Sequence, residues 1–239
     1  MIENKTFRSL SSFPLECGTS LSSVDISYTD VGDKSQPVVW ICHALTANAD
    51  PQEWWPGLVG EGKLLDPARY RIICANNLGS CYGTTGPTSI PAGGEKAYKS
   101  DFPLITIRDI VHAHQLLQHH LGVSQIHLCI GGSMGGQQVM EWAITDPYLF
   151  KNICLLSCNA VFSPWGIAFN EAQRMSIEAG MDSQGNINLL GLEAARGLAM
   201  LSYRNYITFD LSQTEDEDKI DGFKSSSYQR YQGIKLSKR

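Results

Sequence analysis

Ile126-His127-Leu128-Cys129-Ile130-Gly131-Gly132-Ser133-Met134-Gly135 is the stretch that decides the fold of this chain. Its first five residues form a mostly apolar run of strand length, and the residues from Gly131 onward fit the pattern G-x-S-x-G. A helical pattern follows from about Gly136 to Thr145 and stops before Pro147, which cannot continue a helix. The sequence therefore predicts a strand, a tight turn on Ser133 and a helix, in that order.

The turn predicts a nucleophilic serine. A tight strand-to-helix turn holds the serine in a strained conformation, so the residues two positions away must be small, and Gly131 and Gly135 meet that need. The hydroxyl of Ser133 is then pushed out at the carboxyl end of the sheet. The alternative interpretation is that Ser133 only caps a helix and that the glycines only serve a tight turn.

Acyl transfer at a serine also needs backbone N–H groups that point at the developing oxyanion. The first predicted donor is the N–H of Met134, which follows the nucleophile at a helix amino terminus. The second belongs to the loop His43-Ala44-Leu45-Thr46, which directly follows an apolar strand, and we assign it to Leu45.

Strands and helices alternate around this centre, which is typical of a mostly parallel sheet with crossover helices. A further segment, 24–28, is predicted to belong to an antiparallel edge hairpin. Thr106 can cap an amphipathic helix that ends at Gly122. Apolar runs predict buried strands at 38–42, 70–75, 126–130 and 153–157.

The strand pattern stops after Asn159. Two helical segments, 166–179 and 189–203, follow without a strand between them, which favours a helical cap over the sheet. The predicted division is a core at 1–160, and a cap with a tail at 161–239.

The histidines do not fit the order that this fold uses, in which the acid and the histidine base follow the serine. No histidine follows Ser133. All six precede it: His43, His112, His114, His119, His120 and His127. The sequence therefore offers no general base in the expected place.

Composition limits the classes of partner. The 239 residues are 43% hydrophobic and 18% charged, which is enough for a sizeable core. A net charge of −5 gives no basic surface for nucleic acid, so we expect a small-molecule substrate. Seven cysteines show no C-x-x-C spacing or metal-ligand pattern, so no metal is expected. No membrane-length apolar run or leader pattern is found, which predicts a cytoplasmic protein without a membrane partner.

Seven blocks of the chain match one family in order and spacing: 42–46, 54–58, 77–87, 100–103, 106–109, 131–136 and 167–171. They resemble the homoserine O-acetyltransferase family, over roughly residues 7–233. The resemblance implies an α/β-hydrolase fold and transfer of an acetyl group from acetyl-CoA to the hydroxyl of L-homoserine, through an acyl-enzyme on Ser133, in methionine biosynthesis. Acetyl-CoA is then a co-substrate, and no cofactor is implied. Arg204, in Leu201-Ser202-Tyr203-Arg204, matches the arginine that holds the amino-acid substrate.

The resemblance fades after Gly233. Family members continue into further strands that carry the catalytic Asp and His, so a sheet truncated before its last strands is expected here. Alternatives within the family are a homoserine O-succinyltransferase and a serine O-acetyltransferase, and the fold also serves esterase-type hydrolases. The chain is otherwise a non-catalytic fragment or one half of a split enzyme. The sequence does not fix the oligomeric state, and a homodimer is the assembly to test.

Overall fold

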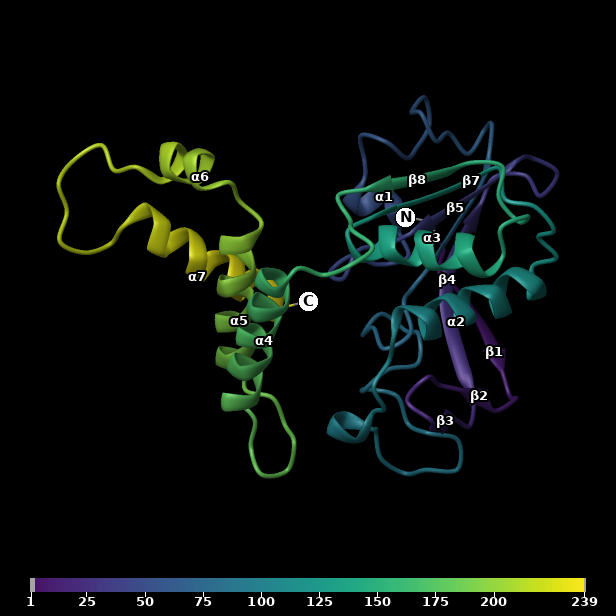
Figure 1. The fold of residues 1–239 in the computed structure, drawn as a ribbon, viewed down its shortest axis with the longest axis horizontal. Coiled ribbons are helices and arrows are strands. Elements are labelled where there is room, and N and C mark those ends of the chain that lie inside the picture. Colours follow the sequence, from purple (N-terminus) through teal and green to yellow (C-terminus); the bar gives the residue numbers. More distant parts are fainter. Residues whose placement is uncertain (1–2, 239) are drawn as a thin grey trace. The chain divides into compact units, whose positions relative to one another are not determined.

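The computed structural model describes residues 3–238 and contains a six-stranded mixed sheet with the order β1-β4-β6-β5-β7-β8 (Figure 1). The chain separates into two compact units, Met1–Ala160 and Val161–Arg239, and the sheet belongs to the first. Its strands are β1 (Lys5–Ser9), β4 (Val24–Val31), β5 (Val38–Cys42), β6 (Arg71–Ala75), β7 (Leu128–Gly132) and β8 (Ile153–Leu156). A separate small hairpin pairs β2 (Phe13–Pro14) with β3 (Ser20–Leu21).

The parallel centre of the sheet agrees with the prediction. β5 pairs in parallel with β6 and β7, and β7 pairs in parallel with β8. All five residues of β5 and of β6 are buried, as expected for strands covered on both faces. β7 begins two residues later than predicted and runs on through Gly132, because Gly131 and Gly132 pair with Leu155 and Leu156 of β8.

The antiparallel pair β1–β4 at one end of the sheet agrees with the prediction for 24–28, and the bounds of its strands differ. β4 is longer than the predicted segment and lies between β1 and β6, so it is not itself at the edge. The edge is β1, whose sequence KTFRS has too little apolar alternation to be detected. Arg8 of β1 makes an ion pair of 2.6 Å with Asp25 of β4.

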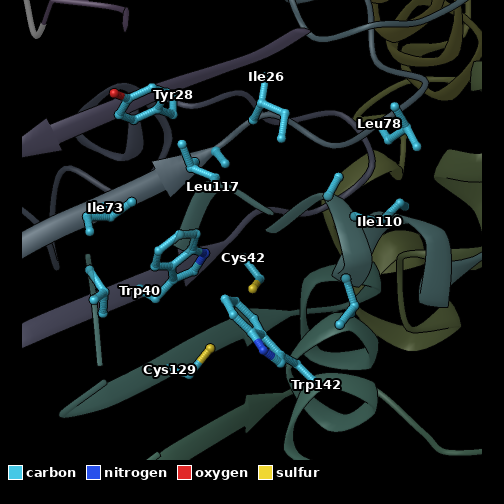
Figure 2. Close-up of a cluster of buried hydrophobic side chains, with 14 of the residues drawn as sticks. Ile26, Tyr28, Trp40, Cys42, Ile73, Leu78, Ile110, Leu117, Cys129 and Trp142 are labelled. Carbon is cyan, nitrogen blue, oxygen red and sulfur yellow. The ribbon is translucent and has the colours of Figure 1, made fainter. Parts of the chain in front are cut away.

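One face of the sheet is covered by helices α2 (Ile107–His120) and α3 (Met134–Thr145). Figure 2 shows Trp40 of β5 facing Trp142 of α3, and their ring centroids lie 5.2 Å apart in an edge-to-face arrangement. Both rings are fully buried. Such pairs stabilise by about 0.5–1.5 kcal/mol beyond the area that they bury.

The other face of the sheet packs against the segment that follows the short helix α1 (Pro51–Trp54). Val59 and Leu65 from this segment contact the alternate side chains of the central strands, among them Ile41 and Ile72. The central strands are therefore covered on both sides.

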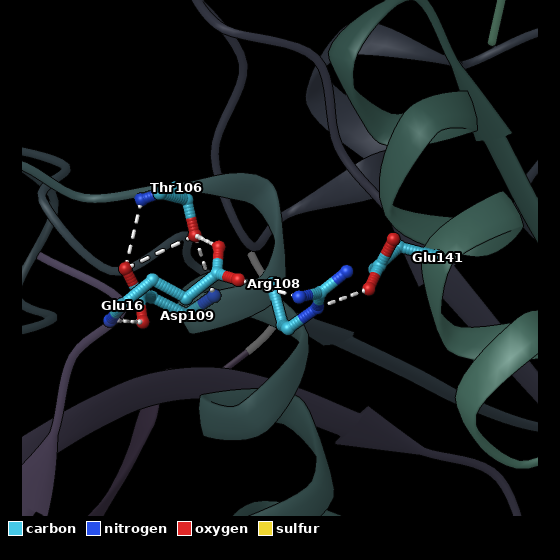
Figure 3. Close-up of polar contacts among 5 residues, drawn as sticks. All are labelled: Glu16, Thr106, Arg108, Asp109 and Glu141. Carbon is cyan, nitrogen blue, oxygen red and sulfur yellow. Dashed lines mark hydrogen bonds and ion pairs between the residues drawn. The ribbon is translucent and has the colours of Figure 1, made fainter.

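A polar cluster fixes the start of α2, and Figure 3 shows its members. Thr106 and Asp109 form a capping box, which confirms that Thr106 caps this helix. Asp109 also accepts a hydrogen bond of 3.0 Å from the backbone N–H of Glu16. Arg108 joins Glu16 to Glu141 of α3, at 2.5 and 2.6 Å, and so links α2 to α3. The one-turn helix η1 (Lys99–Asp101) precedes this cluster.

β8 is the last strand of the sheet in the described part of the chain, and it was predicted to be buried. Its side chains are instead partly exposed, at 45% for Ile153 and 38% for both Leu155 and Leu156. The reason is topological, because no strand pairs with the outer side of β8 within residues 3–238.

The second unit is helical: α4 (Pro164–Ala179), α5 (Leu189–Ser202), α6 (Tyr206–Gln213) and α7 (Lys224–Ser237). The first two match the predicted helices, whereas α6 and α7 were not predicted. Close crossings hold the unit together. A methyl group on Gly191 of α5 would lie 2.7 Å from the Ser176 carbonyl of α4, and one on Gly233 of α7 would lie 2.8 Å from the Glu193 carbonyl of α5. Among the described residues no helix combines the length and apolarity needed to cross a membrane.

Candidate active site

Ser133 lies at the turn between β7 and α3 with φ 56° and ψ −124°. A positive φ is rare for a residue with a side chain, and the surrounding structure must maintain it. The backbone N–H of Ser133 donates to the Leu156 carbonyl of β8 at 2.9 Å, which holds the turn against the neighbouring strand. The residue itself is exposed. This is the strained turn that the G-x-S-x-G pattern predicts.

The glycines around Ser133 are required by close backbone contacts. A Cβ on Gly131 would lie 2.3 Å from the carbonyl oxygen of Gly135. A Cβ on Gly135 would lie 2.0 Å from the carbonyl oxygen of Cys42, at the end of β5. The start of α3 therefore rests directly on the ends of β5 and β7, and only glycine permits that approach.

The two predicted oxyanion donors lie on the elements that the sequence assigned. Leu45 is in the loop after β5, and Met134 is the first residue of α3. Both residues line one cavity of about 580 Å³. Within residues 3–238 neither backbone N–H donates to a protein acceptor. Two free N–H groups, one of them at a helix amino terminus, are suited to an anionic oxygen.

His43, the first residue of the loop that carries Leu45, is fully buried. Its Nε2 accepts a hydrogen bond of 3.1 Å from the backbone N–H of Asn77, so Nδ1 carries the proton and donates to the Ala44 carbonyl at 2.8 Å. Burial lowers the pKa of His43 from 6.5 to about 4. With both ring nitrogens engaged and the ring neutral, His43 supports the loop and is not available as a base for Ser133.

A second layer of polar contacts supports His43. Its carbonyl accepts from the Asn77 side-chain amide at 3.3 Å and from Gln138 of α3 at 3.4 Å. Gln138 in turn accepts from His114 of α2 at 3.2 Å. Burial lowers the pKa of His114 to about 4 as well. The sequence did not lead us to predict this network. Its signal was that two polar residues, His114 and Gln138, occupy core-facing positions of α2 and α3.

Arg204 lies in the second unit, between α5 and α6. Its guanidinium donates to the Tyr228 hydroxyl of α7 at 2.9 Å and lies 5.3 Å from the centroid of the same ring. Its role in binding a substrate stays a prediction. Among the described residues, no group of three or more His, Cys, Asp or Glu side chains is placed to hold a metal ion.

Comparisons with known proteins agree with this geometry. A family described as alpha/beta hydrolase fold matches residues 37–183. The homoserine O-acetyltransferase of Cyclobacterium marinum is 48% identical over 94% of this chain and 66% of its own length. The enzyme of the same name from Chlorobaculum parvum is 42% identical over 97% of this chain and 67% of its own length.

A solved structure shows the same fold. The homoserine O-acetyltransferase from Bacillus anthracis has a TM-score of 0.86 at 20% identity, over 98% of this chain and 71% of that one. The chain spans about two thirds of the length of the curated relatives named above. From the fold, the turn on Ser133 and these likenesses, the chain belongs to the α/β-hydrolase superfamily and, within it, to the homoserine O-acetyltransferase family.

Proposed function

We propose that this chain is part of an enzyme that transfers an acetyl group from acetyl-CoA to the hydroxyl of L-homoserine through an acyl-enzyme on Ser133. The proposal is supported by the strained turn at Ser133, together with the free N–H groups of Leu45 and Met134, which line one cavity. The names of the relatives supply the substrates.

The reaction proceeds in two displacements. Ser133 Oγ attacks the thioester carbonyl carbon and loses its proton to a base, while the Leu45 and Met134 N–H groups stabilise the oxyanion. The C–S bond then breaks, the CoA thiolate leaves and takes up a proton, and the acetyl group stays on Oγ. In the second displacement the homoserine hydroxyl attacks this ester and gives its proton to the base. The bond between the acetyl carbon and Ser133 Oγ then breaks, and Oγ takes a proton back from the base.

The base for these steps is proposed to lie beyond residue 239. No histidine follows Ser133 in the chain, and His43 and His114 are buried and neutral. About a third of each relative's own length lies outside the segment that it shares with this chain, which leaves room for the acid and the base that the family resemblance implies.

Intact-mass spectrometry after exposure to acetyl-CoA tests the nucleophile. We expect an acetyl adduct that forms on the parent chain and is lost in Ser133→Ala, with slow formation because the buried, neutral His43 and His114 do not serve as the base. Ser202→Ala is the matched control, since Ser202 lies in α5 of the other unit. An adduct that persists in Ser133→Ala would refute the assignment of the nucleophile.

The rate at which the acetyl group is lost from the chain distinguishes a homoserine O-acetyltransferase from an esterase-type hydrolase and from the two other transferases. Homoserine should remove the acetyl group faster than water does, whereas an esterase-type hydrolase would lose it at the same rate with or without homoserine. Serine in place of homoserine, and succinyl-CoA in place of acetyl-CoA, test the two other transferases with the same readout.

Arg204 is proposed to hold the carboxylate of homoserine, because a guanidinium can grip a carboxylate through two parallel hydrogen bonds. Arg204→Lys should slow clearance by homoserine and leave acetylation of Ser133 unchanged, since acetylation does not use homoserine. Arg230→Lys, on α7 of the same unit, is the matched control. If both variants slow the transfer of the acetyl group to homoserine equally, Arg204 has no specific role in binding the carboxylate.

A second candidate is one half of a split enzyme, and the partly exposed edge strand β8 favours it. A polypeptide carrying the remaining third of the Cyclobacterium marinum relative should then bind the chain and raise the rate of acetylation. Ile153→Lys on β8 should weaken that binding. No binding and no change in rate would exclude this arrangement.

A further inference from the structure

The peptide bond between Ala44 and Leu45 carries one of the two N–H groups assigned to the oxyanion. This bond is trans and planar, so the Ala44 carbonyl and the Leu45 N–H point in opposite directions. Any group that fixes the Ala44 carbonyl therefore also sets the direction in which the Leu45 N–H points.

Two donors fix the Ala44 carbonyl. His43 Nδ1 donates to it at 2.8 Å, and the backbone N–H of Ala47 donates to it at 3.1 Å. His43 is fully buried, whereas Leu45 is 64% exposed and lines the cavity together with Met134. The carbonyl therefore points toward the buried imidazole, and the Leu45 N–H points away from it.

Only one neutral tautomer of His43 can donate from Nδ1, and Asn77 selects that tautomer. The backbone N–H of Asn77 donates to Nε2 at 3.1 Å, so the proton of the neutral ring is on Nδ1. The His43 carbonyl also accepts from the side-chain amides of Asn77 at 3.3 Å and of Gln138 at 3.4 Å. Two successive carbonyls of the loop are thus hydrogen-bonded before the chain reaches Leu45.

We propose that His43 is a positioning residue for the oxyanion site, and that its Nδ1–H directs the Leu45 N–H toward the oxyanion through the Ala44–Leu45 peptide. The inference rests on the proposed function, which supplies the reaction at Ser133. His43 does not touch the reacting atoms, because its ring is fully buried. Donors that are already oriented stabilise an oxyanion strongly, because they need no reorganisation during the reaction.

The competing interpretation is that His43 only fills space in the core. The atom that faces the Ala44 carbonyl would then be unimportant, and two substitutions test this. Asparagine places an amide nitrogen close to the position of Nδ1 and can still donate to the carbonyl. Glutamine instead places its amide near the position of Nε2, which leaves the Ala44 carbonyl without this donor.

Acetylation by p-nitrophenyl acetate tests the orientation of the Leu45 N–H without CoA. Ser133 Oγ attacks the ester carbonyl carbon, p-nitrophenolate leaves, and the serine proton passes to the buffer. Mass spectrometry of the peptide that contains Ser133 gives the rate constant at saturating ester and the ester concentration for half-saturation.

The rate constant should separate the two variants. Loss of a whole oxyanion donor costs about 100- to 1000-fold in rate, so a misdirected one should cost about 10- to 100-fold in His43→Gln. His43→Asn should lose less than about 3-fold, because it keeps a donor to the Ala44 carbonyl. Half-saturation should stay unchanged in both variants, since His43 does not touch the ester.

Controls distinguish positioning from a loss of stability. Both variants lose the imidazole, so urea unfolding should show similar losses of stability for both. His112→Gln, at a half-buried histidine of α2, is the matched control and should keep the rate of the parent. Equal slowing in the two His43 variants, or a parent-like rate in His43→Gln, would overturn the inference.

Nuclear magnetic resonance of the parent chain gives a second readout that needs neither acetylation nor a variant. Isotope-labelled histidine distinguishes the two neutral tautomers, and we expect the Nδ1–H form for His43. The Nε2–H form, which is the commoner one in free histidine, would overturn the inference. If Ser133 is not acetylated in the parent, the proposed function fails, and the tautomer of His43 then decides the inference by itself.

Discussion

Two buried histidines, one in the loop that carries Leu45 and one on α2, are both held neutral by their surroundings. His43 and His114 are at most 2% exposed, and burial lowers the pKa of each to about 4. Gln138 connects them, since it contacts His114 through its carbonyl and His43 through its amide. The position of the loop thus depends on uncharged imidazoles and on one buried amide.

Acid should destabilise the chain through these two residues. In the unfolded chain each histidine binds a proton below about pH 6.5, whereas in the folded chain it does so only near pH 4. Their stabilising effect is complete above about pH 6.5 and falls as the pH drops toward 4, by up to about 1.4 kcal/mol per pH unit for each. Urea unfolding between about pH 7 and pH 5 measures this slope.

The control for this slope is His119→Gln, because His119 is an exposed residue at the end of α2. Its slope should match that of the parent, whereas His114→Gln should show a smaller one. A free energy of unfolding that does not change over this pH range would contradict the prediction.

Gln138 can be tested against its neighbour. Gln138→Met keeps the length of the side chain but leaves His114 Nε2 without its acceptor, which should cost about 1–3 kcal/mol of unfolding free energy. Gln137→Met, at the next position of the same helix but half-buried, should change stability by less than about 0.5 kcal/mol. Chemical denaturation measures the free energy of unfolding of both variants. Equal losses would contradict the prediction that the buried hydrogen bond to His114 stabilises the fold.

Individual elements are joined by polar contacts as well as by the apolar core. Arg71 of β6 binds Asp30 of β4 through two hydrogen bonds of 2.8 and 2.9 Å. Their side chains are 5% and 6% exposed. This pair lies where the antiparallel strands meet the parallel ones, and it fixes β4 beside β6.

Removing one partner of this pair should be costly. Asp30→Ala leaves the Arg71 guanidinium buried without its carboxylate, and the expected loss is about 3–5 kcal/mol of unfolding free energy. Glu61→Ala, at an exposed loop position, should have almost no effect. The midpoint of urea unfolding gives both values, and a loss below about 1 kcal/mol for Asp30→Ala would show that the pair is not needed.

For the molecule as a whole, the important feature is the difference between the two ends of the sheet. β1 ends it with charged residues, which discourage pairing with other chains, whereas β8 ends it with partly exposed Ile153, Leu155 and Leu156. The turn of Ser133 is hydrogen-bonded to this same strand. The conformation of the candidate site therefore depends on the edge strand β8, whose exposed apolar side chains favour pairing with another chain.

The isolated chain should self-associate through β8. Sedimentation velocity at increasing concentration should show growing species, and Ile153→Lys should reduce them because a lysine on an edge strand opposes pairing. Leu10→Lys, at a leucine that is 80% exposed near β1, is the matched control and should leave association unchanged. A parent chain that stays monomeric at every concentration would contradict this prediction.

The sequence by itself was sufficient for the nucleophile turn, the central strands and the crossover helices. Their signals are local: glycines two residues from Ser133, continuous apolar runs in β5 and β6, and a capping box at Thr106. Backbone sterics and hydrophobic periodicity act over a few residues, so they can be read without the fold. The roles of Ser133, Leu45, Met134 and Arg204 remain predictions.

Only the tertiary structure revealed the contacts between distant segments. The network of His43, Asn77, Gln138 and His114 joins the ends of β5 and β6 to two helices. The cavity beside Leu45 and Met134 lies between segments far apart in the chain. β8 is partly exposed because it is the last strand in the sheet order, whereas its apolar sequence predicts burial. These features depend on which elements are neighbours, and local propensity does not encode that.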